Sequence, residues 1–432
     1  MKGEIIAIGD ELTTGRILNT TSSFAAGHLY GAGHEIIAMS TVGDAPAAIE
    51  SALVRALKRA DFIIVTGGLG ATTDDMTNEA VAKVLARPTT FYPEIFAKIK
   101  GGQPPAEPLC QFSRGKKALA EKQQRKEAGE DNNHPLAKLA WLPEGSRVLK
   151  PEARMAGHLL IHDGKPIFFL PGVPREMREL MLDCVIPYLA DWRGTDVRQV
   201  NQRIYMVFGL PEININQCLR HLEERTGVRI GYYPVYPEVH VSLTVLGDQT
   251  NGSSAIFEEA DREITKLLGQ HCFGTNQQTM ESVVGQLLKE HNLTVALAES
   301  CTGGLVSHSL TRVPGSSAYF IGGVVAYANA VKEQVLGVAP DILAKFGAVS
   351  LETARAMALG IRRLLRSDIG LSVTGIAGPE GGTDEKPVGH VCFALNSEKG
   401  CREQVCRFRG DRWQIQAIAA ESALEMVRQH LM

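Results

Sequence analysis

Short apolar runs alternate with stretches of helical period in this chain, and this alternation constrains its fold more than any other feature. Over the first ninety residues, strands and helices are expected in turn at residues 4–8, 19–30, 35–39, 45–60 and 61–65. That order predicts a parallel sheet covered by helices. The last third repeats the pattern, with a strand expected at 293–298 and a helix at 351–365 capped by Ser350. The sequence therefore predicts two separate α/β layer folds.

The chain is 432 residues long, which suggests about three domains of about 150 residues each. We place an N-terminal parallel-sheet domain at 1–190, a small α+β module at 195–272 and a C-terminal α/β domain at 276–432. Residues 101–134 lose the periodic pattern and are rich in Gly, Lys, Gln and Arg. We expect them to form a mobile surface insertion within the first domain.

Composition excludes several classes of function. The formal net charge is −3, from 45 Lys+Arg against 48 Asp+Glu, so no basic excess favours nucleic acid as a partner. The apolar start is too short for a secretory signal and no later run is long enough to span a membrane, so we expect a cytoplasmic protein without membrane contact. The eight cysteines show no zinc-site spacing. We expect reduced and mostly buried thiols, with Cys301 set apart by its motif.

The segment Ala298-Glu299-Ser300-Cys301-Thr302-Gly303-Gly304 is the most informative one, because it lies where a buried strand should end and a helix begin. Backbone amides at such a junction can hold an anion or stabilise an oxyanion. Ser300 can act as a nucleophile only with a base in reach, and no histidine occupies a comparable motif. Lys332 lies just past another predicted strand end, and burial would lower its pKa enough for this role.

A third glycine-rich loop, at 373–383, follows a third predicted strand and carries Thr374. The three loops are expected to converge on one rim of the sheet. The residue types alone leave a structural alternative open: Ser300 would cap a helix beginning near Thr302, Lys332 would be a solvated helix residue, and the third loop would be a tight turn.

These motifs, with Lys386-Pro387-Val388-Gly389 and Gly410-Asp411-Arg412, resemble the C-terminal domain of CinA proteins, the nicotinamide mononucleotide deamidase family. The resemblance implies metal-free hydrolysis of nicotinamide mononucleotide to nicotinate mononucleotide and ammonia. It implies Ser300 as nucleophile, Lys332 and Tyr327 in proton transfer, and Thr374 in the pocket. The substrate-binding residues it implies are Glu299, Cys301, Thr302, Gly303, Gly304, Gly375, Gly378 and Arg412. Gln416 departs from the family, in which a second arginine is expected.

The first third offers a different chemistry. The loop Thr66-Gly67-Gly68-Leu69-Gly70 can supply amides to a phosphate. Carboxylates that suit a divalent ion follow it or lie on neighbouring strand-end loops: Glu11, Asp44, Asp74 and Asp75. The alternative is that Asp74 or Asp75 only caps the following helix.

Together with Leu170-Pro171-Gly172-Val173-Pro174, these segments resemble the MoaB/MogA-like, molybdopterin-binding-type domain at the N-terminus of CinA proteins. The resemblance implies a metal-dependent ADP-ribose pyrophosphatase. Two departures are Ala71, where the family usually has proline, and 150–158, which replaces an Asn…Gly-Thr-Ala-Pro-Gly loop. The middle module resembles the KH-like linker domain of the same proteins, but it has no G-x-x-G clamp, so RNA binding does not follow.

The expectation from sequence is therefore a nicotinamide-nucleotide amidase of pyridine-nucleotide salvage. It needs no cofactor for deamidation, while a divalent metal and a second, pyrophosphatase activity belong to the N-terminal domain. The expected partners are a small nucleotide substrate and a second copy in a homodimer. The alternative is a nucleotide- or pterin-binding scaffold protein whose C-terminal pocket is idle.

Overall fold

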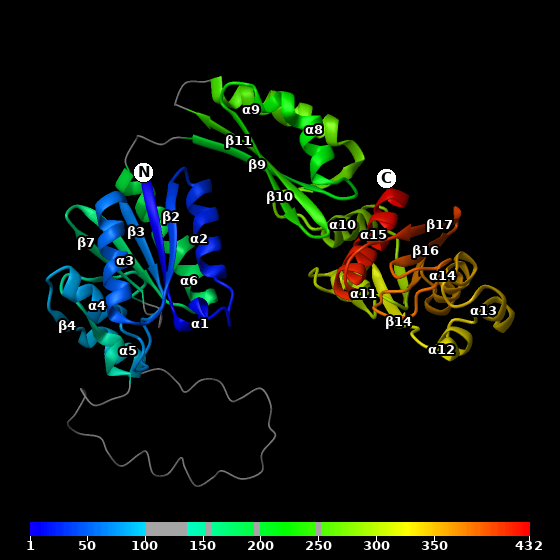
Figure 1. Cartoon of the computed structure of the whole chain (residues 1–432), viewed down its shortest axis with the longest axis horizontal. Helices are drawn as coiled ribbons and strands as arrows, with labels where there is room; N and C mark the ends of the chain where they lie inside the picture. The colour runs from blue at the N-terminus through cyan, green and yellow to red at the C-terminus, as the bar shows by residue number, and fades with distance from the viewer. Residues whose placement is uncertain (101–135, 152–156, 194–198, 248–251) are drawn as a thin grey trace, which may run out of the picture. The chain divides into compact units, whose positions relative to one another are not determined.

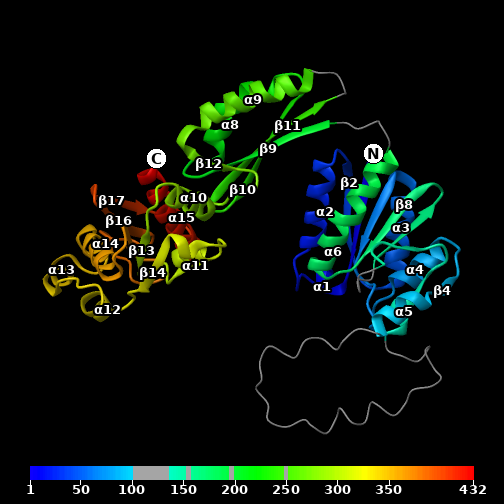
Figure 2. The same ribbon diagram turned by 180° about the vertical axis from the view of Figure 1, so that it is seen from behind.

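The computed structural model describes residues 1–100, 136–151, 157–193, 199–247 and 252–432. The chain divides into two compact units, one of residues 1–200 with 247–249 and the other of residues 201–246 with 250–432. Figures 1 and 2 show the elements of both units from opposite sides. The insertion expected at 101–134 lies outside the described residues, as does the centre of the departing loop at 150–158.

A six-stranded sheet in the order β2-β1-β3-β8-β7-β6 forms the frame of the first unit. Its strands are β1 (Lys2–Ile8), β2 (Glu35–Val42), β3 (Phe62–Thr66), β6 (Arg147–Val148), β7 (His158–His162) and β8 (Lys165–Leu170). The expected parallel arrangement is confirmed for β2, β1, β3 and β8. The antiparallel strands β7 and β6, which the sequence analysis did not predict, extend this sheet.

Helices cover both faces of that sheet, because successive strand residues point to opposite sides. Ile6, Ile63 and Val65 pack with α3 and α4, while Ile5 and Ile64 pack with α2, α6 and α7. The helices are α1 (Asp10–Thr13), α2 (Thr20–Gly31), α3 (Pro46–Arg59), α4 (Thr77–Val84), α5 (Pro93–Lys100), α6 (Pro174–Leu180) and α7 (Ile186–Arg193). A small ladder of β4 (Thr89–Phe91) and β5 (Trp141–Pro143) lies beside α4.

The second unit begins with the small α+β module. Its four-stranded sheet has the order β10-β11-β9-β12, and β10 and β12 were not predicted from the sequence. The elements are β9 (Gln199–Val207), α8 (Glu212–Glu223), β10 (Val228–Val235), β11 (Glu238–Gly247), α9 (Gly252–Leu268) and β12 (Cys272–Thr275). Leu219, Val241 and Ile264 are fully buried between the sheet and its helices.

The C-terminal part of the second unit holds a five-stranded sheet in the order β14-β13-β15-β16-β17. Its strands are β13 (Val295–Glu299), β14 (Phe320–Val325), β15 (Ile369–Gly375), β16 (His390–Ser397) and β17 (Gly400–Arg407). Here β14, β13 and β15 run parallel, while β16 and β17 are antiparallel. The carboxyl ends of the three parallel strands therefore meet at one edge, where ligands bind in open α/β sheets.

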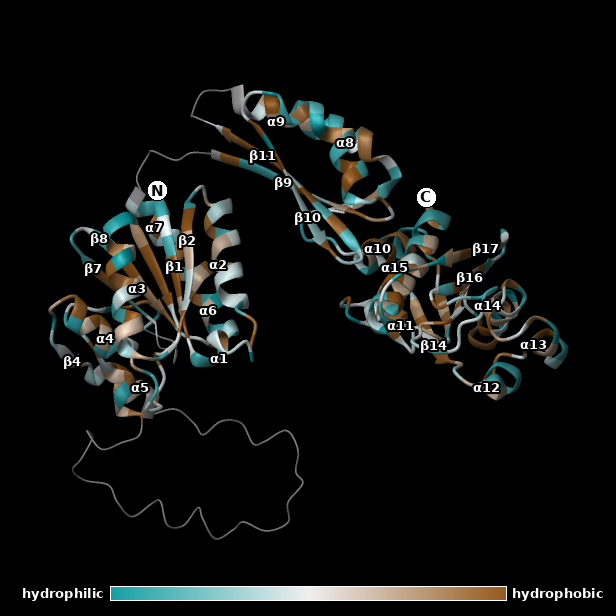
Figure 3. Cartoon of the chain, viewed as in Figure 1, coloured by the Kyte–Doolittle hydropathy of each residue, from teal (hydrophilic) through white to brown (hydrophobic). Residues whose placement is uncertain are grey.

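Two helical layers cover this second sheet. The helices are α10 (Met280–Glu290), α11 (Leu305–Thr311), α12 (Asn329–Gln334), α13 (Pro340–Phe346), α14 (Leu351–Leu365) and α15 (Arg412–Leu431). Apolar residues of α10, α11 and α15 share one core cluster, and those of α13 and α14 share another. Hydropathy follows these layers, with brown strands inside and teal helix faces outside (Figure 3). Among the described residues, no helix is long and apolar enough to cross a membrane.

Candidate active site

Three loops meet at the rim of the C-terminal sheet, as the sequence predicts. Glu299, the last residue of β13, pairs with Val325 of β14 and with Val373 of β15. The amide of Ser300 donates to the carbonyl of Val373 at 2.9 Å, which places Ser300 beside the strand that carries Thr374. Since the strands are in register, the loops that follow them open on the same side of the sheet.

Ser300 and Lys332 are in direct contact at this rim. The Nζ atom of Lys332 lies 3.2 Å from Ser300 Oγ, 2.6 Å from the carbonyl oxygen of Ala326 and 3.1 Å from that of Tyr327. Lys332 is 1% exposed, and burial lowers the pKa of its amine from the ordinary lysine value. None of the three neighbours carries a charge, so none of them forms an ion pair that would offset the effect of burial on the pKa. The alternative of a solvated lysine is wrong.

The turn after β13 is held by Glu299. Its carboxylate, which is 1% exposed, accepts five hydrogen bonds, from the hydroxyls of Thr302 and Ser307 and the amides of Gly304, Val306 and Ser307. These amides open helix α11, whose positive end a carboxylate stabilises. The helix begins at Leu305 and not near Thr302, and Glu299, not Ser300, satisfies its first amides. Ser300 as a mere helix cap is therefore wrong.

Cys301 lies next to Ser300, but its thiol is poorly suited to be the nucleophile. It is 5% exposed, and burial raises the pKa of the thiol to about 12. A thiol at neutral pH is a weak nucleophile because the reacting species is the thiolate. The broader expectation of mostly buried thiols is wrong, since only Cys301 and Cys392 are buried among the seven described cysteines, which form no disulfide.

Tyr327 and Arg412 form an outer wall. The Tyr327 side chain is exposed, and its hydroxyl accepts a hydrogen bond of 3.2 Å from Arg412 Nη2, while only its backbone carbonyl contacts Lys332. Arg412 Nη1 donates to the carbonyl of Gly378 at 2.7 Å. Arg412 thus joins the loop after β14 to the loop after β15. The Tyr327 hydroxyl therefore contacts Arg412 and not Lys332. A role for this hydroxyl in proton transfer stays a prediction.

The loop after β15 is closely packed. The Thr374 hydroxyl donates to the carbonyl of Ala348 at 2.7 Å, so its oxygen keeps only acceptor capacity toward a ligand. A side chain at Gly375 would meet Val391 and the carbonyl of His390. Gly378 has φ of +81°, which favours glycine, and precedes a cis peptide to Pro379. Packing at Gly375 and the backbone conformation at Gly378 therefore each favour glycine, whether or not these residues also bind substrate.

Two contacts at this rim were not predicted from the sequence. Gln416, noted only as a departure from the family, donates from Nε2 to the carbonyl of Cys301 at 2.8 Å and so supports the turn that contains Ser300. Tyr236, from the β10–β11 turn of the small module, donates to the carbonyl of Gln414 at 3.0 Å, and its ring lies 6.0 Å from that of Trp413. A hairpin distant in sequence cannot be linked to the start of α15 by local pattern.

The first unit carries its own cavity of about 450 Å³ at the carboxyl ends of β1, β3 and β8. Glycine residues of the Thr66–Gly70 loop line it together with all four predicted metal ligands, Glu11, Asp44, Asp74 and Asp75. Glu176 of α6 is a fifth carboxylate in the lining that the sequence analysis did not single out. The structure thus brings the predicted carboxylates to one rim beside a glycine loop.

Two of the carboxylates in this cavity, Asp44 and Asp75, already have partners in the chain. Asp44 and Asp10 exchange backbone-to-carboxylate hydrogen bonds of 2.8 and 3.1 Å. Asp75 accepts from the amide of Thr72 at 2.9 Å, whereas helix α4 has no side-chain cap, so the helix-cap alternative is wrong. Hard oxygens suit a divalent ion. Within the described ranges, however, no three His, Cys, Asp or Glu side chains are grouped closely enough to hold a metal. We therefore assign no metal-dependent reaction step to this cavity.

Comparisons with known proteins cover the whole chain. A CinA-like protein of Desulfotalea psychrophila is 46% identical over 99% of this chain and 98% of its own length. The chain belongs to the CinA family. A CinA-like protein of Syntrophobacter fumaroxidans is 39% identical over 98% of this chain and 95% of its own length.

The CinA assignment extends to each part of the chain. Residues 277–431 match the CinA C-terminal domain, residues 4–191 the "Probable molybdopterin binding domain", and residues 202–274 the "Damage-inducible protein CinA KH domain". The crystal structure of a competence/damage inducible protein, CihA of Agrobacterium tumefaciens, is 40% identical, covers 35% of this chain and 93% of its own, and has a TM-score of 0.34. The expected family and the multi-domain α/β fold class are confirmed.

Proposed function

We propose that the C-terminal domain hydrolyses the carboxamide of nicotinamide mononucleotide to nicotinate mononucleotide and ammonia. The observation that carries this proposal is the contact between Ser300 Oγ and the buried amine of Lys332. A neutral amine has two N–H bonds for the carbonyls of Ala326 and Tyr327 and one lone pair for the Ser300 hydroxyl. The same three contacts also match the three N–H bonds of an ammonium ion, so it is the burial of the amine, which lowers its pKa, that supports a general base.

In this mechanism Ser300 Oγ attacks the carboxamide carbon while its proton passes to Lys332 Nζ. We assign the backbone amides of Cys301 and Thr302, which follow the nucleophile in the turn, to the oxyanion. Collapse of the intermediate breaks the C–N bond, and Lys332 returns the proton to the leaving ammonia. A water molecule, deprotonated by the same amine, then hydrolyses the acyl-serine ester to the carboxylate and free Ser300.

Arg412 supports a nucleotide substrate at this rim. Its guanidinium is exposed, bridges two of the three loops, and provides positive charge toward a phosphate. The thiol beside the nucleophile does not compete with it, because Cys301 is protonated at neutral pH. Thr374, whose hydroxyl proton is engaged by Ala348, can accept one hydrogen bond from the carboxamide nitrogen.

The proposal is tested by incubating the full-length protein with nicotinamide mononucleotide and measuring ammonia together with nicotinate mononucleotide. Equal amounts of both products are expected. Nicotinamide riboside is the matched probe for the phosphate contact and should react more slowly. If neither product forms, the alternative of a binding or scaffold protein with an idle pocket takes its place.

We propose for the N-terminal domain a nucleotide-binding role, with cleavage of the ADP-ribose pyrophosphate as its activity. The observation that favours it is the cavity of about 450 Å³ in which glycine amides face several carboxylates. Glu11, Asp44, Asp74 and Asp75 line this cavity but, among the described residues, are not grouped closely enough to hold a metal, so we place only the pyrophosphate there, against the glycine amides. Release of AMP and ribose 5-phosphate from ADP-ribose with added Mg²⁺ is the test.

A further inference from the structure

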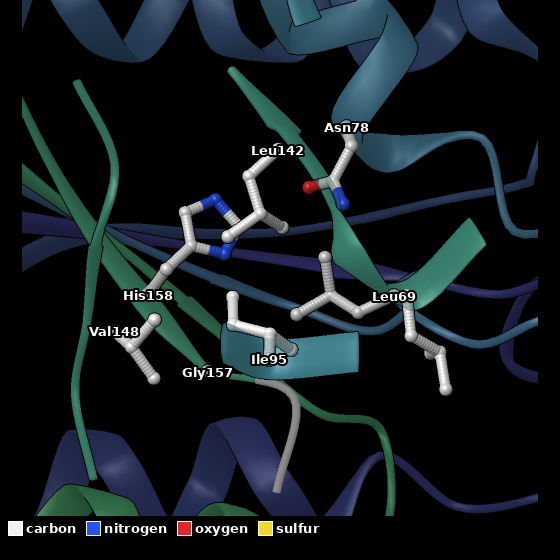
Figure 4. A pocket seen from close by; sticks show the side chains of 8 residues that line it. Leu69, Asn78, Ile95, Leu142, Val148, Gly157 and His158 are labelled. Carbon is white, nitrogen blue, oxygen red and sulfur yellow. The ribbon is translucent and has the colours of Figure 1, made fainter. Parts of the chain in front are cut away.

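A second, smaller cavity of about 20 Å³ adjoins the large N-terminal one, since Leu69 and Leu139 line both. It lies between α4, α5 and the β5, β6 and β7 edge, and most of its lining is apolar (Figure 4). Its other lining residues are Asn78, Ile95, Leu142, Val148, Gly157 and His158. A space of this size accommodates one water molecule or one group of similar size.

Two polar atoms in this cavity have no partner. His158 is 2% exposed and Asn78 is 8% exposed, yet His158 Nε2 and Asn78 Oδ1 make no hydrogen bond with any described residue. Figure 4 shows the two side chains approaching from opposite sides of Leu142. Native proteins rarely leave such atoms unsatisfied, so a hydrogen-bonding group that the chain does not supply is expected between them.

Both side chains are held in place. The His158 ring stacks on Phe169, with centroids 4.5 Å apart and planes 13° from parallel. The Asn78 amide donates from Nδ2 to the carbonyl of Trp141 at 3.2 Å, which leaves Oδ1 for the cavity. Burial lowers the pKa of His158 to about 3, so the ring is neutral near pH 7. With its proton on Nδ1, Nε2 is a second acceptor opposite Oδ1.

We propose that this cavity is a recognition subsite for the exocyclic amino group of an adenine nucleotide whose ring lies in the larger cavity. The inference rests on the nucleotide-binding role proposed for the N-terminal domain and adds the two residues that would recognise the base, Asn78 and His158. An amino group has two N–H bonds, one for each acceptor, and the leucines shared by the two cavities present apolar surface to a flat ring. Hypoxanthine carries an oxygen at this position and would set a third acceptor against two.

Calorimetry with the full-length protein tests this, using ADP-ribose and inosine diphosphate ribose as paired probes. ADP-ribose is expected to bind at least about tenfold more tightly, because the second probe loses two hydrogen bonds and adds a repulsion. Equal affinities would mean that the cavity holds only a buried water, and would overturn the subsite alone. Binding of neither probe would overturn the nucleotide-binding role and the subsite together.

Variants locate the effect. Asn78→Leu and His158→Phe should reduce the preference for ADP-ribose to about onefold to threefold, because ADP-ribose loses a hydrogen bond while inosine diphosphate ribose loses a repulsion and binds somewhat more tightly. His162→Phe, a matched change on the same strand outside the cavity, should keep the full preference. Thermal unfolding shows whether each variant is folded. If His158→Phe does not fold, the binding preference of Asn78→Leu alone tests the proposal. A preference that persists in Asn78→Leu overturns the proposal.

Discussion

The two rims of this protein both lie at the carboxyl ends of parallel strands, but their ionisable side chains differ in exposure to solvent. At the C-terminal rim Lys332 is almost fully buried and its acceptors are uncharged. At the N-terminal rim the carboxylates of Glu11 and Asp74 are exposed at the mouth of a large cavity. Burial at the first rim favours the neutral form of the lysine, whereas the second rim presents hydrated charge. Similar sheet edges thus provide two different electrostatic environments, set by the loops that follow the strands.

The sharpest test of the C-terminal half of this comparison is Ser300→Ala. If Ser300 forms the acyl-enzyme, ammonia release from nicotinamide mononucleotide should fall by about 10⁴-fold or more. Ser309→Ala, a matched change on α11 where the hydroxyl bonds only to the carbonyl of Leu305, should leave it unchanged. Near-normal turnover by Ser300→Ala would remove the proposed mechanism.

The next test concerns the base. The pKa of Lys332 is lowered by burial, and the amine acts only when neutral, so the rate should rise as pH increases through that lowered pKa and level off above it. Lys332→Arg keeps the charge but cannot lose its proton, and should cost about 10³-fold with loss of this pH dependence. Lys345→Arg, on exposed α13, is the control. If Lys332→Arg keeps its activity, Lys332 is not the base, and Tyr327 or water takes that role.

Chelation should separate the two rims. With EDTA, ADP-ribose cleavage is expected to fall by at least about 10²-fold, because hydrated carboxylates alone cannot neutralise a pyrophosphate. Ammonia release should not change, since the residues proposed for deamidation are a serine, a lysine and backbone amides. Both assays are run on one protein sample, so each rim serves as the control for the other. Loss of deamidation with EDTA would contradict the metal-free mechanism proposed for the C-terminal rim.

Glu299→Gln should have a milder effect than either change at the reacting groups. The neutral amide cannot accept all five hydrogen bonds of the carboxylate, so stability should fall by about 2 kcal/mol. Misplacement of the turn should lower kcat by about tenfold. Denaturant unfolding and steady-state rates measure the two effects. A loss as large as that of Ser300→Ala would instead indicate a direct part in the reaction.

The smallest expected effect comes from Gln416→Ala. Loss of its single hydrogen bond to the Cys301 carbonyl should lower kcat/KM for deamidation by about threefold. Gln414→Ala is a poor control because that side chain belongs to the capping box of α15, whereas Gln429→Ala lies at the far end of the same helix. Steady-state kinetics of Gln416→Ala and Gln429→Ala measure the effect. An unchanged kcat/KM in Gln416→Ala would mean that the contact with Cys301 does not contribute to catalysis.

Local pattern was enough to predict much of this structure. Helix α14 and its Ser350 cap occur at the expected residues, because a hydrophobic stripe and a cap are signals within one segment. The convergence of Ser300 and Lys332 was predictable because both follow strands of one parallel sheet.

Among the features that were missed, strand β7 did carry a local signal, since it pairs with β8 through the two-residue turn Asp163-Gly164, in which both residues have positive φ. Others depend on contacts that no single segment contains. The sequence places Tyr327 near Lys332, but only the fold shows that the backbone carbonyl, and not the hydroxyl, makes the contact. The isolated acceptors of His158 and Asn78 were invisible for the same reason, since the two residues come from distant elements.

The carboxylate of Glu299 also affects the entropic cost of binding substrate. Because it fixes the amides of Gly304, Val306 and Ser307 in the free protein, the ordering of the turn that contains Ser300 is completed during folding and adds nothing to the cost of substrate binding. These amides should therefore exchange slowly with deuterium without substrate and change little when it binds. The turn would behave as a rigid template, and any substrate-dependent motion would belong to the exposed wall formed by Tyr327 and Arg412.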